Sequence, residues 1–177
     1  MNDKKTHKLV LTALFAALVC VATMVIQIPS PMNGYVNLGD CFVLLSGWIL
    51  GPVWGFFAGG VGSALADLFS GYTIYVPGTL VVKGCMALVG SLLYTGLRKV
   101  SSKYPSVQQL CSGVVAECIM VAGYFGYAAL LLGNGLAAAT SIPGNLVQGG
   151  IGLICALVLA KLFSATPLLK AKMDRAT

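Results

Sequence analysis

Charged side chains are almost absent from two long stretches of this sequence. Residues 9–97 contain only Asp40, Asp67 and Lys83 as Asp, Glu, Lys or Arg, and residues 104–160 contain only Glu117. Over all 177 residues 9% are charged, against about 25% in an average soluble domain. Because so few charges cannot cover a water-facing surface, a soluble globular enzyme and a disordered chain are both excluded. We therefore expect an integral membrane protein.

Apolar segments separated by turn residues predict the number of spans. A membrane-spanning helix needs about 20 residues, so the chain has room for six such helices with tight loops. The predicted spans cover residues 9–28, 39–50, 53–69, 78–97, 107–132 and 142–162, in one domain of residues 1–177. The second span is short, and Gly51-Pro52 makes a tight reversal after it. The expected fold class is an all-α bundle of six transmembrane helices.

Basic residues fall on one side of this predicted topology. They lie before the first span, around the link between the fourth and fifth spans, and from the end of the sixth span onward, whereas the alternate loops contain none. They are Lys4, Lys5, Lys8, Arg98, Lys99, Lys103, Lys161, Lys170, Lys172 and Arg175. Since lysine and arginine concentrate in cytoplasmic loops, we expect both termini in the cytoplasm. The net charge of +6 forms no basic stripe on a soluble face, so nucleic acid is not an expected partner.

Motifs of enzymes and metal proteins are missing from the sequence. There is no P-loop, no H-E-x-x-H, no G-x-S-x-G and no group of aspartates spaced to hold catalytic magnesium. The six cysteines have no metal-ligand spacing and indicate small apolar fillers. We expect no catalytic residue, no metal and no cofactor, and any ATP-driven work would need a partner.

Ionisable residues in the spans are the candidates for a functional site, because a charge in the bilayer is costly. Asp67 ends a stripe of small residues that packs against another helix, so it serves as a structural cap or as the ion-pair partner of Lys83. Asp40 begins the second span, where a carboxylate can cap free amides. Lys83 serves either Asp67 or a ligand.

Glu117 lies near the middle of the fifth span, on the same helix face as Tyr124. A lone carboxylate at that depth costs several kcal/mol unless it is paired or protonated. It can bind a flat heteroaromatic ligand with N–H donors; the alternatives are a pair with Lys83 and a protonated acid. Asn145 and Gln148 share a face of the sixth span and fit either ring substituents or hydrogen bonds between helices.

A series of short motifs runs through the chain in a characteristic order. They are A-x-x-x-A at 13–17, N-L-G-D at 37–40, L-G-P-V-W-G-F-F-A-G-G at 50–60, Asp67, Y-V-P-G-T-L-V-V-K-G at 75–84 and I-P-G-N-L-V-Q at 142–148. Their order and spacing resemble the substrate-binding S component of energy-coupling-factor (ECF) vitamin transporters, over about residues 8–163. Within that family the chain looks most like the group for hydroxymethylpyrimidine or pyridoxine-type compounds.

The resemblance implies a high-affinity subunit that binds a small water-soluble vitamin or precursor near the outer face of a bacterial-type plasma membrane. It also implies two kinds of partner, a transmembrane coupling protein and two cytoplasmic ATPases. The family's alanine motif contacts the coupling protein, which implies that role for Ala13 and Ala17. The family's substrate regions correspond here to Asn37, Lys83, Glu117, Tyr124, Asn145 and Gln148. Asp40 and Asp67 are then structural charges.

Two other functions remain open from the residues. One is a self-sufficient proton-coupled carrier or channel that uses Asp67, Lys83 and Glu117 as a relay. The other is a purely structural membrane subunit. An S component should co-purify with ATPases, whereas a carrier should work alone in liposomes. Stabilisation against heat by a ligand would separate both from a structural subunit.

Overall fold

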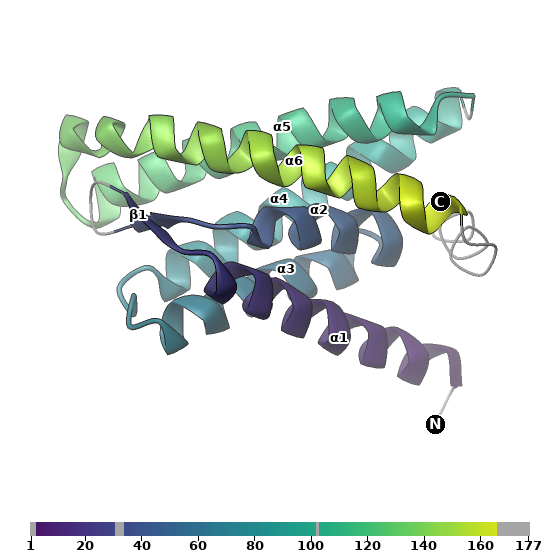
Figure 1. The fold of residues 1–177 in the computed structure, drawn as a ribbon, viewed down its shortest axis with the longest axis horizontal. Helices are drawn as coiled ribbons and strands as arrows, with labels where there is room; N and C mark the ends of the chain where they lie inside the picture. Colours follow the sequence, from purple (N-terminus) through teal and green to yellow (C-terminus); the bar gives the residue numbers. More distant parts are fainter. Residues whose placement is uncertain (1–2, 31–33, 102, 166–177) are drawn as a thin grey trace.

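Proline and glycine set most of the helix boundaries. The computed structural model describes residues 3–30, 34–101 and 103–165 (Figure 1). Its helices are α1 (Asp3–Val25), α2 (Gly39–Leu50), α3 (Pro52–Phe69), α4 (Val76–Val100), α5 (Pro105–Gly126) and α6 (Ile142–Ala165). Gly51 turns the chain between α2 and α3 at φ 87°, a conformation that favours glycine. Pro52 and Pro105 occupy the first helical position, where the missing N–H costs nothing.

Short irregular elements complete one end of the bundle. A hairpin of β1 (Ile28–Ser30) and β2 (Gly34–Val36) joins α1 to α2, with Ile28 paired to Val36. A π-helical turn, η1 (Tyr127–Leu131), extends α5, and a 3₁₀ segment, η2 (Gly135–Ser141), precedes α6. The first helix ends at Val25, before the predicted residue 28, because the chain becomes extended around Pro29, which has no N–H for a helix.

The two ends of the bundle differ in character. Figure 1 shows the start of α1, the α4–α5 connection and the end of α6 together at one end, and the hairpin with η1 and η2 at the other. The first of these ends is here called the basic end. The described basic residues other than Lys83 lie on its helix ends or in the α4–α5 connection: Lys4, Lys5, Lys8, Arg98, Lys99, Lys103 and Lys161. Lys170, Lys172 and Arg175 lie outside the described residues. That the basic end faces the cytoplasm stays a prediction.

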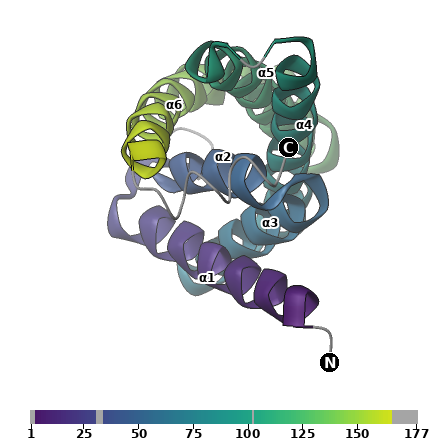
Figure 2. The same ribbon diagram turned by 90° about the vertical axis from the view of Figure 1, so that its right-hand side faces the viewer.

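The six helices form the expected membrane bundle, but they are not six equal spans. By length and composition, four segments are long and apolar enough to cross a membrane: Lys5–Val25, Val76–Val100, Pro105–Leu131 and Gly135–Ala165. The 12 residues of α2 extend over about 18 Å, whereas the hydrocarbon core is about 30 Å thick. In Figure 2, α2 crosses the middle of the bundle, and it packs against α1, α3, α4 and α6.

Small residues allow the helices around α2 to approach closely. A Cβ added to Gly47 would lie 2.5 Å from the carbonyl oxygen of Ala87 in α4, and one added to Gly55 would lie 2.7 Å from the Cα of Gly47. Both distances are too short for a side chain, so glycine is required there. This close packing holds the C-terminal half of α2 against α3 and α4, and the first turn of the same helix carries Asp40, one of the polar residues described next.

Candidate binding site

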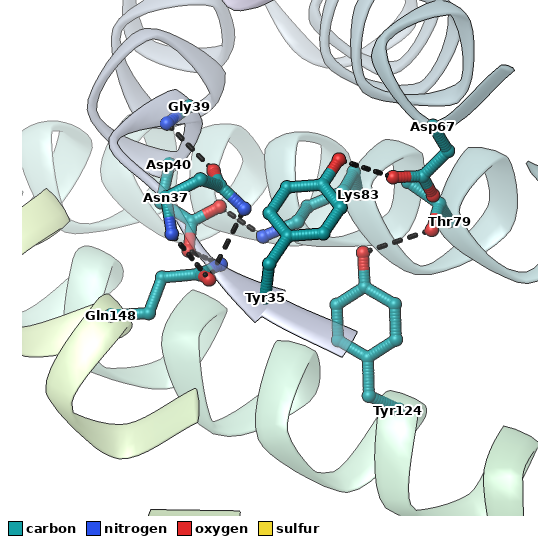
Figure 3. Close-up of polar contacts among 9 residues, drawn as sticks. All are labelled: Tyr35, Asn37, Gly39, Asp40, Asp67, Thr79, Lys83, Tyr124 and Gln148. Carbon is teal, nitrogen blue, oxygen red and sulfur yellow. Dashed lines mark hydrogen bonds and ion pairs between the residues drawn. The ribbon is translucent and has the colours of Figure 1, made fainter. Parts of the chain in front are cut away.

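Polar side chains from five helices, α2 to α6, and the hairpin meet toward the hairpin end of the bundle (Figure 3). They form two neighbouring groups. The first, here called the inner network, consists of Asn37, Asp40, Lys83 and Gln148. The second is a pocket whose walls carry four tyrosines, here called the tyrosine pocket. Asn37 and Gln148 belong to the network and also line the pocket.

A buried ion pair is the centre of the inner network. Lys83 of α4 donates through Nζ to Oδ1 of Asp40 in α2, and both side chains are almost completely buried. Gln148 of α6 donates from Nε2 to the second oxygen, Asp40 Oδ2, at 2.7 Å. A buried ion pair offsets its desolvation cost only when further hydrogen bonds satisfy the charged groups. Gln148 supplies such a bond and ties α6 to α2.

Asn37 completes the inner network from the segment between β2 and α2. Its backbone N–H and its side-chain amide both donate to Gln148 Oε1, at 3.0 and 3.2 Å. Its own Oδ1 accepts from the backbone N–H of Gly39 at 2.8 Å, which satisfies a free amide at the start of α2. The network therefore closes on itself, and each of its four side chains has a partner within the protein.

An ion pair between Asp67 and Lys83, one of the alternatives left open by the sequence, is not formed, because Lys83 pairs with Asp40. The central position of α2 places Asp40 directly against the second turn of α4. Asp40 also differs from its predicted capping role: its carboxylate accepts from Lys83 and Gln148, and the Gly39 amide at the start of α2 donates to the side chain of Asn37 instead. Asp67 lies at the far end of α3, beside the hairpin, where it meets a different partner.

The tyrosine pocket opens at the hairpin end and is lined from every helix except α1 and α2. Its lining residues are Tyr35, Asn37, Asp67, Tyr72, Tyr75, Thr79, Tyr124, Ala128, Ser141, Asn145 and Gln148. Tyr35 comes from β2, and Tyr72 and Tyr75 come from the turn between α3 and α4. The Tyr35 and Tyr72 rings contact each other with centroids 4.7 Å apart. The pocket is thus aromatic on several sides with a few polar groups between the rings.

Asp67 is the acceptor at the wall of the tyrosine pocket. The Tyr35 hydroxyl donates to Asp67 Oδ1 at 2.5 Å, a length typical of an O–H donor on an ionised carboxylate. Asp67 also interacts with the Thr79 hydroxyl, which accepts a hydrogen bond from the Tyr124 hydroxyl at 3.1 Å. Burial, and then the hydrogen bond to Asp67, raise the pKa of Tyr35, so Tyr35 remains a neutral donor at physiological pH.

Lys83 connects the two groups. Its Nζ lies 5.4 Å from the centroid of the Tyr124 ring, within range of a cation–π interaction. Tyr124 in turn lines the pocket. The ammonium group therefore lies behind the pocket wall, paired with Asp40, and does not line the pocket.

Glu117 is absent from the described pocket lining. Its side chain is 8% exposed, and neither carboxylate oxygen has a hydrogen-bond partner among the described residues. It lies between α5 and α6, so close to Gly149 that a Cβ there would be 2.8 Å from Glu117 Oε2. Sharing a helix face with Tyr124 was the signal that suggested a ligand contact. In the structure Tyr124 lines the pocket, whereas Glu117 packs against Gly149 of α6.

The structure thus brings four of the predicted substrate residues to one pocket: Asn37, Tyr124, Asn145 and Gln148. The sequence reasoning missed Tyr35, Tyr72 and Tyr75. Their signal was available, since tyrosines are concentrated in two loops that contain no lysine or arginine. Their meeting, however, is visible only in the structure, where the hairpin and the α3–α4 turn lie together at the end of α3.

The two alanines of the motif in α1 lie on the same exposed face. Ala13 and Ala17 are exposed on the outside of the bundle, whereas Phe15 and Val19 point inward and are buried. Ala16 instead packs against α3, where a Cβ on Gly62 would lie 2.5 Å from its carbonyl oxygen. Ala13 and Ala17 are therefore accessible to a partner helix in the membrane.

Comparisons of the sequence with known proteins agree on one class. A family model described as "ECF-type riboflavin transporter, S component" matches residues 3–165. An "uncharacterized protein in gap 3'region" of Pyrococcus woesei is 37% identical over 144 residues, 77% of this chain and 93% of that protein. The thiamine precursor transporter HmpT of Lactococcus lactis is 28% identical over 171 residues, 96% of this chain and 95% of that protein.

A solved structure shares the fold. It is described as the S component of a bacterial ECF transporter and matches with a TM-score of 0.72. The match covers 91% of this chain and 97% of that one, at 20% sequence identity. At that identity the likeness concerns the arrangement of the helices alone.

Proposed function

Because the chain belongs to the family of ECF-type transporter S components, a family of membrane substrate-binding subunits and not of enzymes, we propose that the tyrosine pocket binds a small flat nitrogen heterocycle. Compounds of the hydroxymethylpyrimidine or pyridoxine type fit best. The relative HmpT, named as a thiamine precursor transporter, supports this choice. So does the resemblance of the sequence motifs to that group.

The observation that carries the proposal is the composition of the pocket wall. Aromatic faces contribute stacking to a flat ligand, and a few fixed polar groups orient it. Asn145 lines the pocket, and its side-chain amide makes no hydrogen bond to another described residue. An amide with both donors and acceptor available suits the ring nitrogen and substituents of a heterocycle.

The size of the pocket favours one ring over several. Its cavity volume is about 50 Å³, whereas an engineered apolar cavity that binds benzene measures about 150 Å³. The pocket is open on one side, so a ligand need not be fully enclosed, and among flat heterocycles a single six-membered ring requires the smallest movement of the walls. The three fused rings of riboflavin, the compound in the family's description, would require much more.

The energy for transport comes, in this proposal, from a transmembrane coupling protein and two cytoplasmic ATPases. The exposed pair Ala13 and Ala17 supports a contact on α1, because small side chains let a partner helix approach closely. The substitution Ala17→Trp should abolish uptake and co-purification of the partners, while ligand affinity stays near the wild-type value. Val25→Trp, at an exposed position outside the alanine pair on the same helix, is the matched control. Loss of ligand binding together with assembly would indicate a general folding defect and contradict the proposed contact.

Calorimetric titration of the purified protein tests the ligand. Hydroxymethylpyrimidine or pyridoxine should bind more tightly than thiamine, and riboflavin should bind weakest. A riboflavin affinity above that of the one-ring compounds would overturn the ligand assignment. Uptake by the chain alone in liposomes, without ATPases, would instead support the proton-coupled carrier.

A further inference from the structure

The charge that faces a ligand in the tyrosine pocket is negative. Asp67 is the only Asp, Glu, Lys or Arg side chain among the described residues that line it. The nearest cation, Lys83, is already paired with Asp40 behind the wall. Among the described lining residues a ligand therefore meets one carboxyl group and no cation, and the electrostatic attraction of Lys83 reaches Asp67 from behind the wall.

Asp67 has acceptor capacity left for a ligand. Two carboxylate oxygens offer about four acceptor positions, and the described contacts are those with Tyr35 and Thr79. The Tyr35 bond also fixes the orientation of the carboxylate, because it is short and because the Tyr35 ring is held against Tyr72. The group is thus oriented before a ligand arrives.

The surrounding rings favour the same kind of ligand. Tyrosine faces attract cations and electron-poor rings through their quadrupole, and Tyr35, Tyr72 and Tyr75 all lie on the wall near the end of α3. A phosphate or carboxylate in this place would face both the tyrosine rings and Asp67. Like charges in an environment of low dielectric repel strongly.

We propose that Asp67, oriented by Tyr35, is the residue that determines substrate specificity in the tyrosine pocket. It selects neutral or cationic heterocycles that present an N–H donor, such as a ring-bound amino group, and it rejects phosphorylated or carboxylated compounds. This inference rests on the proposed function. It assigns to Asp67 the ligand contact that the sequence reasoning gave to Glu117.

Two ligand pairs test the inference on the wild-type protein. Hydroxymethylpyrimidine with its ring amino group should bind about ten- to a hundredfold more tightly than the analogue in which hydrogen replaces that group, the range expected for one charge-assisted hydrogen bond. Hydroxymethylpyrimidine should also bind more tightly than its phosphate ester. Equal affinities within either pair would overturn the inference.

Two variants separate recognition by Asp67 from a structural role. Asp67→Asn should reduce the affinity for the amino compound and leave that for the deamino analogue nearly unchanged. Tyr35→Phe keeps the ring, removes the donor to Asp67 and should reduce both affinities to a similar, smaller extent. If Asp67→Asn lowers both affinities equally, Asp67 only supports the hairpin and the inference is wrong. Melting temperatures without ligand show which variants fold. If the Asp67→Asn variant does not fold, the two ligand pairs on the wild-type protein test the inference by themselves.

Failure of the inference is distinguishable from failure of the proposed function. If the wild-type protein binds no one-ring heterocycle, the proposed function fails and the inference fails with it. If such a compound binds but its N–H group and its phosphorylation state do not affect affinity, the inference alone fails. Glu117→Gln serves as the matched carboxylate control, since this side chain is absent from the described lining, and it should leave both affinity ratios at the wild-type values.

Discussion

The inner network and the tyrosine pocket use the same kinds of residue for opposite purposes. Each contains one carboxylate, Asp40 in the network and Asp67 in the pocket. In the network, a lysine and two amides bond the carboxylate and one another until every side chain has a partner inside the protein. In the pocket, the carboxylate and Asn145 face an opening lined by tyrosines. The comparison shows that residue type alone does not decide the role of a polar group. A group whose hydrogen bonds are all made within the protein stabilises the fold, whereas a group that faces an opening can bind a ligand.

The two regions also share residues. Gln148 donates to Asp40 and at the same time lines the pocket, and Lys83 lies beneath the Tyr124 ring. The inner network therefore lies beneath the pocket and holds two of its lining residues, Asn37 and Gln148, in place. Substitutions in the network should mainly change stability, and substitutions in the pocket should mainly change affinity.

Breaking the ion pair should have the largest effect. Asp40→Asn removes the carboxylate that bonds the buried Lys83 ammonium, and breaking a buried ion pair typically costs about 3–5 kcal/mol of unfolding free energy. The double variant Asp40→Asn/Lys83→Met removes both charges and should be milder. A double-mutant cycle on thermal unfolding in detergent should give a coupling above about 1 kcal/mol. The same cycle between Asp67 and Lys83 is the control and should show weaker coupling; the reverse order would contradict the observed pairing.

Gln148→Met should affect both regions and so test their connection. Methionine has a similar length but cannot donate to Asp40 or accept from Asn37, and unsatisfied buried groups cost about 1–3 kcal/mol. We expect a lower melting temperature together with weaker ligand binding. A loss of stability without any change in affinity would mean that the inner network and the tyrosine pocket are independent.

Tyr72→Ala should weaken binding while largely sparing the fold. Tyr72 is half-buried at the pocket wall and contacts the Tyr35 ring, and an aromatic contact contributes about 0.5–1.5 kcal/mol, so affinity should fall about two- to tenfold. Tyr72→Phe keeps the ring and should stay near the wild type. Calorimetry measures the affinity, and an unchanged value for Tyr72→Ala would remove this residue from the site.

Glu117→Gln should have the smallest effect. If Glu117 bound the ligand, as the sequence suggested, affinity would fall about ten- to a hundredfold. The structure instead places this buried carboxyl against Gly149 with no hydrogen-bond partner among the described residues. Glutamine fills the same space, so we expect affinity near the wild-type value and stability equal or slightly higher. A large loss of affinity would show that the pocket extends to Glu117 when a ligand is bound.

The sequence by itself determined the class of protein. The membrane location, the number of helices and the family were all predicted and confirmed. Hydrophobic segments, turn residues and the placement of basic residues are local features of the chain, so they can be identified from the sequence without knowing the fold. The grouping of basic residues at one end follows from the same count.

Only the tertiary structure decided which polar groups meet. Asp40 and Lys83 are 43 positions apart, and Tyr35 and Asp67 are 32 apart. Several carboxylates were available to one lysine, and the choice depended on α2 lying at the centre of the bundle. The hairpin likewise carried Tyr35 to the end of α3. Pairings of this kind follow from distances between helices, which no local pattern in the sequence contains.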